Sequence, residues 1–240
     1  MTNKKIILSI VLPAYREDEN LRNILPRLID VTKNLKIITE IIVVDTEVPL
    51  DKTHSVCKKF SVRYISRKGG NYFGSAVRTG ISAANGKFIL FMDADGSHTP
   101  EFIPDLLEFS SSHDVVVASR YIDKGHTENS LLLIWMSMFL NWTYSYILNI
   151  PCKDVSNSFK LYKSYDIKQL NLECNNFDIV EEILFKLCLK NPNLKIKEVP
   201  FTFKKRMYGE TKRNLIVFMI TYLWTIFKLK FSQFKKIDHE

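Results

Sequence analysis

The sequence predicts an α/β fold with a mostly parallel sheet and helices on both of its faces. Short apolar runs alternate with stretches of helical spacing through the first half of the chain, and this alternation is typical of strands joined by right-handed helical crossovers. The runs are continuously apolar, as expected for strands that are buried on both faces. Polar clusters follow three of the runs, at the sheet edge where such folds bind ligands.

Five apolar runs rich in Ile, Val and Phe are expected to form strands: Ile6–Leu12, Ile41–Val44, Val62–Ile65, Phe88–Met92 and Val115–Ala118. The first run follows two lysines, as in a signal peptide. It is short and lacks a small-residue cleavage site, so we expect a buried strand instead.

Helical spacing in the first half predicts the elements between these strands. The residues that repeat on one helical face after the first strand are Leu21, Ile24, Leu25, Leu28 and Ile29. Pro26 either kinks this helix or marks its true start. Residues 52–60, 74–85 and 100–109 are expected to supply three more helices.

The pattern changes in the second half. Residues 131–150 carry no charge, residues 178–190 have helical spacing, and Lys195–Phe203 is typical of a strand. The chain has no internal repeat and no low-complexity linker, so we expect no second independent domain.

Composition restricts the class of protein. The chain has 240 residues, of which 46% are hydrophobic, and this content favours a folded domain over disorder. A net charge of +8 suits a phosphate-rich substrate, anionic lipid or nucleic acid. No nucleic-acid-binding motif accompanies the basic residues, so we expect no nucleic-acid partner. The cysteines form no CxxC pair and are expected to be reduced thiols in the cytoplasm: Cys57, Cys152, Cys174 and Cys188.

Two carboxylates directly follow the strand at residues 88–92. Asp93 and Asp95 lie two positions apart and can share one hard divalent cation, which can in turn hold a diphosphate. The alternative is a simple turn, because Asp95 is followed by a glycine. Polar residues 14–17 and Asp45 follow two other strands, and their expected convergence at one edge favours metal binding.

With these clusters the chain resembles the family 2 glycosyltransferases of the glycosyltransferase-A fold, a Rossmann-like sheet flanked by helices. Within them it is most similar to the polyprenyl-phosphate (dolichyl-phosphate) mannosyl- and glucosyltransferases. The resemblance runs from about Ile7 to Lys212. Its carriers are Leu12 to Glu17, Val43 to Asp45, Gly74 to Ala76, Met92 to His98, Ser119 to Tyr121, Lys153 and Asp154 with Phe159, and Tyr208 to Lys212.

The resemblance implies a role for each matching residue. The residues expected to bind the nucleotide-sugar donor are Pro13, Tyr15, Glu17, Asp45, Gly74, Asp93, Arg120, Arg206 and Lys212, the last two from a mobile loop. The residues expected to hold Mg²⁺ or Mn²⁺ are Asp93, Asp95 and Ser97. A cation and guanidinium groups would stabilise the negative charge of a departing nucleoside diphosphate. For Arg120 the alternative is a surface ion pair.

A proton-accepting carboxylate is harder to identify. Asp95, Arg120 and Glu182 are the expected catalytic residues, but Glu182 stands with Asp178 and Glu181 at the start of a probable helix, where acidic residues also stabilise the helix dipole. A lipid-phosphate acceptor has a second pKa near ~6, so it is largely ionised and needs little help from a general base.

Three departures from the family pattern concern recognition. Thr46 stands where relatives usually carry a second Asp, so the choice between a GDP- and a UDP-hexose stays open. Lys160 replaces a family arginine. The arginines expected to meet the acceptor phosphate are replaced by apolar residues within 131–140, and Lys124, His126 or Lys160 could substitute.

Two apolar segments suggest contact with a membrane. Polar residues recur every fourth position from Ser137 to Asn149, while Trp135, Phe139, Trp142 and Tyr146 lie on the opposite face. An interfacial helix or hairpin fits this pattern best, and a buried helix or a true span are the alternatives. The run Leu215–Phe227 is followed by Lys228, Lys230, Lys235 and Lys236 and also suits adsorption to acidic lipid.

We therefore expect a glycosyltransferase-A catalytic domain over residues 1–214, including an interfacial segment at 128–150, and a membrane-associating tail over 215–240. The expected reaction is inverting transfer of a hexose, foremost mannose from GDP-mannose, to a polyprenyl phosphate at the cytoplasmic face of a membrane. A membrane-anchoring partner subunit is a further candidate partner. The alternatives are a UDP-sugar donor with a glycan or protein acceptor, and a catalytically silent nucleotide-binding scaffold.

Overall fold

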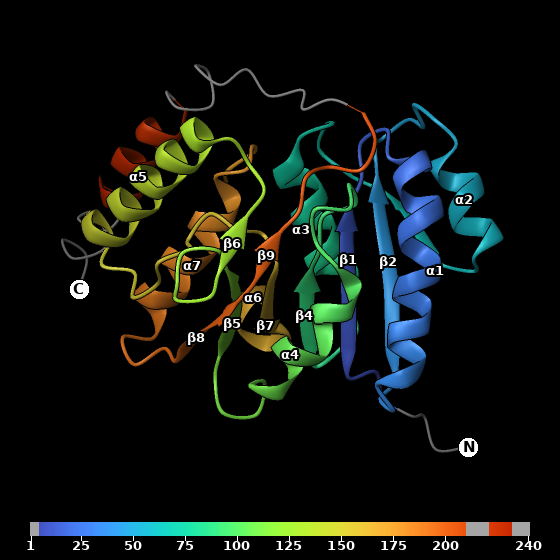
Figure 1. Ribbon diagram of the computed structural model, residues 1–240, viewed down its shortest axis with the longest axis horizontal. Coiled ribbons are helices and arrows are strands. Elements are labelled where there is room, and N and C mark those ends of the chain that lie inside the picture. Colours follow the sequence, from blue (N-terminus) through green and yellow to red (C-terminus); the bar gives the residue numbers. More distant parts are fainter. Residues whose placement is uncertain (1–4, 210–220, 232–240) are drawn as a thin grey trace.

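A central β-sheet organises the structure, which is a computed structural model that describes residues 5–209 and 221–231 (Figure 1). Within those residues the sheet has seven strands in the order β3-β2-β1-β4-β7-β5-β8. Their bounds are β1 Leu8–Pro13, β2 Thr39–Asp45, β3 Arg63–Ser66, β4 Phe88–Phe91, β5 Val115–Ser119, β7 Lys160–Lys163 and β8 Ile196–Pro200. The five predicted strands of the first half are all present, and none of their ends is shifted by more than two residues.

The sheet is mostly parallel, as predicted. β1 pairs in parallel with β2 and β4, β2 with β3, and β5 with β8. β7 is antiparallel to both of its neighbours, β4 and β5. The sequence did not predict β7, because this four-residue strand begins and ends with lysine. The predicted strand Lys195–Phe203 is divided into β8 and β9 (Thr202–Phe203), and β9 pairs with β6 (His126–Thr127).

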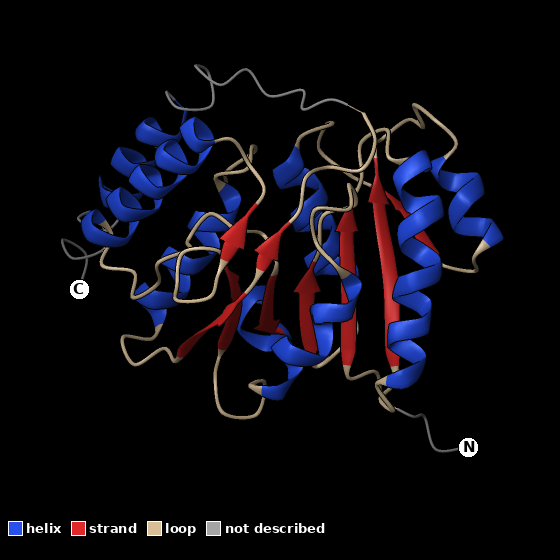
Figure 2. Ribbon diagram, viewed as in Figure 1, coloured by secondary structure: helices blue, strands red, loops and turns tan. Residues whose placement is uncertain are grey.

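Helices cover both faces of the sheet (Figure 2). On one face, α1 (Asp18–Asn34), α2 (Thr53–Lys59) and α4 (Ile103–Glu108) pack against apolar side chains of β1 and β4. Pro26 lies inside α1, so the helix begins well before it and the alternative that Pro26 marks its start is wrong. A short 3₁₀ turn, Pro100–Phe102, precedes α4.

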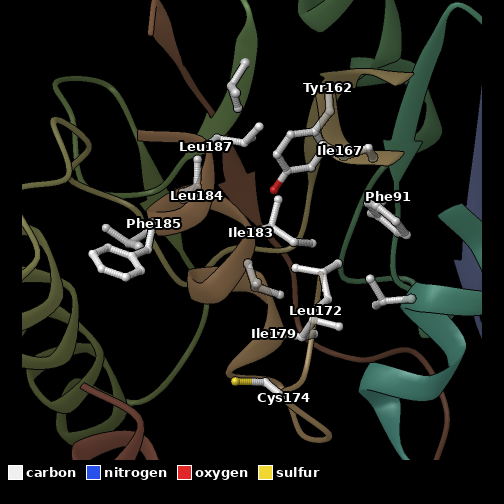
Figure 3. Packing of buried hydrophobic residues seen from close by; sticks show 14 of the residues in the cluster. Phe91, Tyr162, Ile167, Leu172, Cys174, Ile179, Ile183, Leu184, Phe185 and Leu187 are labelled. Carbon is white, nitrogen blue, oxygen red and sulfur yellow. The ribbon is translucent and has the colours of Figure 1, made fainter. Parts of the chain in front are cut away.

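The other face carries α3 (Phe73–Ala83), α6 (Ser164–Lys168) and α7 (Ile179–Lys190). Their buried side chains form one cluster with Phe91 and Tyr162 of the sheet, shown around α7 in Figure 3. Because both faces are covered, β4 and β5 are buried at every residue and β1 at all but its last, which explains their apolar sequences.

One further helix, α5 (Leu131–Ile147), lies at the end of the molecule beside the helical residues 221–231. The Tyr144 hydroxyl donates to the carbonyl of Tyr222 at 2.8 Å, and the Lys230 ammonium donates to the carbonyl of Ile147 at 3.0 Å. The described residues contain no helix with both the length and the apolar character needed to cross a bilayer. The rest of the predicted tail, 215–220 and 232–240, lies outside the described residues.

Candidate active site

The carboxyl ends of β1, β2 and β4 meet at one edge of the sheet. This topology brings together Glu17 after β1, Asp45 at the end of β2 and Asp93 after β4, as the sequence predicts. The segment 204–208 returns to the same edge from the far end of the chain. Its backbone donates from Lys204 to the carbonyl of Ser97 and from Met207 to the carbonyl of Asp95.

The two carboxylates after β4 are partly exposed and partly held. The Ser158 hydroxyl donates to Asp93 Oδ1 at 2.8 Å, and about a fifth of the Asp93 side chain is exposed. Asp95 Oδ1 accepts from the backbone and the hydroxyl of Ser97 at 3.0 and 2.6 Å. Each carboxylate therefore keeps one oxygen that is held less tightly: Asp93 Oδ2 is 3.9 Å from a His98 nitrogen, and Asp95 Oδ2 is 3.4 Å from Arg206.

These residues fit a divalent cation that is bound together with a substrate. Among residues 5–209 and 221–231, no group of three or more His, Cys, Asp or Glu side chains is arranged to hold a metal ion. Mg²⁺ usually binds through one or two carboxylates, waters and substrate phosphates, so a pair of carboxylates is sufficient. Ser97, a predicted metal ligand, donates its hydroxyl to Asp95, and this contact orients the carboxylate.

Glu17 and Arg206 form an ion pair that joins the loop after β1 to the returning segment 204–208. The guanidinium Nη2 lies 2.5 and 2.6 Å from the two oxygens of Glu17, and Nη1 lies 3.4 Å from Asp95 Oδ2. Burial raises the pKa of Glu17, although Arg206 and Asn20 both donate to its carboxylate. Asn20 also exchanges hydrogen bonds with the backbone of Tyr208. The predicted contribution of Arg206 to the site is thus present in its geometry, whereas Lys212 lies outside the described residues.

Asp45 lies in a buried polar group at the end of β2. The hydroxyl of Tyr64 donates to its Oδ2 at 3.1 Å, and burial raises the pKa of this carboxyl. The buried Arg67 guanidinium donates to the backbone carbonyls of Ala14, Asp45 and Tyr72, so one side chain ties together three loops of the edge. Sequence reasoning missed Arg67, and its position directly after β3 is the signal that could have found it.

Pro13 and Tyr15 follow the first strand at the same edge. Pro13 lines a small, mainly apolar cavity together with Asp93 and Ser158. Tyr15 is partly exposed, and the guanidinium of Arg16 lies 5.9 Å from the centre of its ring. Pro13 and Tyr15, both predicted to bind the donor, lie near Glu17 at the end of β1 and in the loop after it.

The Arg120 side chain is only 8% exposed and pairs with the fully buried Asp154, so the alternative of a surface ion pair is wrong. Its guanidinium forms two hydrogen bonds with Asp154, at 2.8 and 2.6 Å, and one with the Ser156 hydroxyl at 3.0 Å. Burial alone would lower the pKa of Arg120, but the Asp154 carboxylate outweighs it and raises that pKa. The Ser156 hydroxyl also accepts from Asn141 of α5, so Arg120 is connected to that helix. These contacts fix the position of the Arg120 guanidinium, and its contact with phosphate stays a prediction.

Glu182 and Gly74, a predicted catalytic and a predicted donor-binding residue, both contact the loop around residues 173–175. The Glu182 carboxylate accepts from the backbone N–H groups of Glu173 and Cys174 and from the Lys186 ammonium, so it anchors the preceding loop and is not placed as a free base. Gly74 donates its N–H to Asn175 of that loop. A Cβ at Gly74 would lie 2.2 Å from the Cys174 carbonyl oxygen, so close packing accounts for this glycine.

The three residues expected to substitute for the missing arginines, Lys124, His126 and Lys160, differ in their exposure to solvent. Lys160 is completely buried, and its ammonium donates to the backbone carbonyls of Val155 and Asn157. It cannot meet an acceptor phosphate in this position, and that alternative is wrong. Lys124 and His126 are exposed.

The carboxyl edge of the sheet in this α/β protein thus carries the carboxylates of Asp93 and Asp95, the buried carboxylates of Glu17 and Asp45, and the guanidinium of Arg206 from the returning segment. The chain belongs to the family described as glycosyl transferase family 2, whose model matches residues 9–170.

Curated relatives and solved structures agree with this family. The chain is 32% identical to a dolichol-phosphate mannosyltransferase of Pyrococcus furiosus over 85% of its length, but spans only 58% of that relative. It is 29% identical to a dolichol-phosphate mannosyltransferase of Saccharomyces cerevisiae, covering 93% of this chain and 88% of the relative.

The solved structures extend the likeness to the fold. Glucosyl-3-phosphoglycerate synthase from Mycobacterium tuberculosis, in complex with Mn²⁺, UDP and glucosyl-3-phosphoglycerate, matches with a TM-score of 0.69 and 14% identity, covering 95% of this chain and 80% of that one. Mannosyl-3-phosphoglycerate synthase from Rubrobacter xylanophilus matches with a TM-score of 0.74 and 16% identity, covering 96% and 75%. Both are similar in fold, and the glycosyltransferase-A architecture expected from the sequence is confirmed.

Proposed function

We propose that this glycosyltransferase moves mannose from GDP-mannose to a polyprenyl phosphate, with inversion at the anomeric carbon. The observation that carries the proposal is the pair Asp93 and Asp95 at the carboxyl edge of the sheet, with Arg206 beside them. The relatives named dolichol-phosphate mannosyltransferase support the choice of sugar and acceptor.

Asp93 and Asp95 would hold Mg²⁺ or Mn²⁺ against the donor diphosphate. When bound, the ion would neutralise the negative charge that develops on the departing GDP. Arg206 is positioned to exchange its contact with Asp95 for a phosphate oxygen, because its Nη1 is the more weakly held end of the guanidinium. Pro13, Tyr15, Glu17 and Asp45 would form the wall of the nucleotide pocket.

The acceptor needs no strong general base. An ionised phosphate oxygen forms the new bond to the anomeric carbon, while the bond from that carbon to the diphosphate breaks and its electron pair leaves with GDP. Since a phosphate monoester has a second pKa near ~6, its oxygen is largely deprotonated at neutral pH. This chemistry agrees with a site in which the Glu182 carboxylate is already engaged by backbone N–H groups.

We further propose that α5 and the helical residues 221–231 rest on the cytoplasmic face of a membrane. The polar side of α5 faces the protein, where Asn141 is buried against Ser156. The opposite side of α5 exposes large apolar residues, and the neighbouring helix 221–231 exposes three more; together they are Leu131, Leu132, Trp135, Phe139, Trp142, Tyr146, Trp224, Phe227 and Phe231. Lys228 and Lys230 lie on the second helix, and such basic residues suit anionic headgroups.

A second candidate function retains the fold but changes donor and acceptor. Thr46 replaces a family aspartate beside Asp45, and α5 carries no arginine for an acceptor phosphate. Both features favour a UDP-sugar with a glycan or protein acceptor, which would require a base to deprotonate a hydroxyl.

The test is a transfer assay with radiolabelled GDP-mannose or UDP-glucose, a polyprenyl phosphate in vesicles, and Mn²⁺. We expect labelled lipid from GDP-mannose, and a loss of at least a hundredfold with Asp95→Asn. Labelled lipid formed from UDP-glucose and not from GDP-mannose would identify UDP-glucose as the donor. Tight nucleotide binding without any lipid-linked sugar would contradict the acceptor.

Vesicle sedimentation tests the membrane surface separately. Binding to vesicles containing phosphatidylglycerol should decrease in a Trp135→Ser, Trp224→Ser double variant, whereas Tyr165→Ser, at an exposed aromatic residue outside this surface, serves as the matched control. Equal binding by both variants would contradict the assignment.

A further inference from the structure

His98 is a fully buried imidazole directly beneath the candidate metal site. Its ring stacks on Phe159 at a centroid distance of 4.7 Å and lies edge-on to Phe201 and Phe203. Such surroundings would suit a phenylalanine equally well. The two ring nitrogens are what distinguish this residue from an apolar core side chain.

Both nitrogens have defined partners. The backbone N–H of Asp93 donates to His98 Nδ1 at 2.9 Å, so Nδ1 carries no proton. Nε2 lies 3.0 Å from Asn157 Oδ1, and the Asn157 amide nitrogen donates to the carbonyl of Ala118, which fixes the amide's orientation. The imidazole is therefore neutral, with its proton on Nε2 and donated to Asn157.

This chain of contacts fixes the backbone from which the Asp93 carboxylate projects. Asp93 lies two residues after the last residue of β4, Phe91, and its N–H points to the buried ring of His98. The Ser158 hydroxyl, one residue after Asn157, holds the carboxylate of the same aspartate. Backbone and side chain of Asp93 are thus both anchored to the segment 157–158.

We propose that His98 is a positioning residue for the metal site, acting through its unprotonated Nδ1 on the backbone of Asp93, with Asn157 selecting the tautomer. The inference rests on the proposed role of Asp93 in metal binding. Residues that orient a metal ligand from behind typically change metal affinity by ~10- to 100-fold when they are replaced.

Two substitutions separate the acceptor from the bulk of the ring. In His98→Asn the side-chain oxygen occupies the place of Nδ1 and can still accept from Asp93. In His98→Gln the amide reaches the place of Nε2, so the Asp93 N–H has no acceptor. His98→Phe keeps the ring stacking without either nitrogen.

Mn²⁺ binding in the presence of GDP, followed by electron paramagnetic resonance, is the measurement. We expect His98→Asn to remain within ~3-fold of the wild-type affinity, and His98→Gln and His98→Phe to lose ~10-fold or more. Melting temperatures show whether each variant is folded. Equal Mn²⁺ affinities in the three folded variants would overturn the inference.

The wild-type protein supplies an independent readout and separates the two claims. Nitrogen NMR of the histidine rings should show Nδ1 unprotonated and Nε2 protonated at His98, and the opposite tautomer would overturn the inference even if no variant folds. If the wild type binds no Mn²⁺ with either GDP or UDP, the proposed function fails first, and the role of His98 fails with it.

Discussion

Arg206 and Glu17, which are 189 residues apart in the chain, form a two-point ion pair across the candidate site, with Nη2 2.5 and 2.6 Å from the two carboxylate oxygens. The same guanidinium donates from Nε to the Tyr208 carbonyl and reaches Asp95 at 3.4 Å. Arg206 therefore holds the returning segment 204–208 against the edge of the sheet and neutralises part of the charge that a metal ion would also neutralise.

Removing Arg206 should strengthen the binding of Mn²⁺ alone. In Arg206→Ala the guanidinium no longer competes with Mn²⁺ for Asp95. A partly exposed ion pair of this kind contributes ~0.2–1 kcal/mol, which corresponds to up to ~5-fold in Mn²⁺ affinity. The affinity for a nucleotide diphosphate should fall, because its phosphate loses a partner. Calorimetric titration checks both, with the exposed Lys205→Ala as a control of equal charge. Weaker Mn²⁺ binding by Arg206→Ala alone would contradict competition at Asp95.

Gly96 is required by both its conformation and its neighbour. Its φ is +88°, and a Cβ there would lie 2.4 Å from Met207 Cγ. Gly96→Ala should displace the segment 204–208 and raise the KM for the donor by ~10-fold. Gly209→Ala is the matched control, since Gly209 also has a positive φ but its nearest Cβ contact would be 3.5 Å away. Equal effects of both changes would mean that backbone strain alone, and not contact with Met207, explains the loss.

Glu181 should make stability depend on pH. Burial raises its pKa to about 8 from the ordinary 4.5, while Lys160 opposes the shift. Between these pH values the folded protein keeps a proton that the unfolded chain releases, so the free energy of unfolding should fall as pH rises from about 4.5 to 8. The full effect is on the order of a few kcal/mol.

Thermal unfolding across this range tests the role of Glu181. Glu181→Gln should reduce the change in melting temperature with pH and stabilise the protein at pH 8. Glu47→Gln, at an exposed residue, should leave the pH dependence unchanged. A slope retained in Glu181→Gln would assign the pH dependence to another group.

Glu182→Gln should reduce stability more than catalysis. A glutamine retains one acceptor for the N–H groups of Glu173 and Cys174 but places its NH₂ where the carboxylate accepted, at a cost of ~1–3 kcal/mol. We expect the melting temperature to fall by several degrees and kcat to stay within ~3-fold. A general base typically contributes ~10²–10⁴-fold, so a loss of that size at an unchanged melting temperature would restore the catalytic assignment.

The fold was largely predictable because it depends on burial, which is written locally. Strands β1, β2 and β4 are covered on both faces and carry continuous apolar runs. β7 escaped prediction because its first residue is a lysine, whose buried ammonium donates to two carbonyls of the preceding loop. The sequence alone does not distinguish a charged side chain that is buried with tertiary partners from one that is exposed to solvent.

The candidate site was predictable in its residue types and less so in its partners. The strand ends identified Asp45, Asp93 and Asp95, since topology alone brings those ends together. Arg120 was expected to meet phosphate, but its partner Asp154 lies 34 residues further along the chain. Nor does the sequence reveal that His98 supports Asp93 from behind, because a ring nitrogen facing a backbone N–H depends on the path of the turn.

The proposed transfer depends on Asp93 and Asp95 to hold the ion that binds the donor diphosphate. A crystal structure of the protein soaked with Mn²⁺ and GDP, with anomalous scattering to locate manganese, tests it most directly. We expect one manganese ion coordinated by at least one of these carboxylates and by the diphosphate, with Arg206 drawn away from Asp95. Bound GDP with manganese elsewhere, and both carboxylates without a metal, would contradict it.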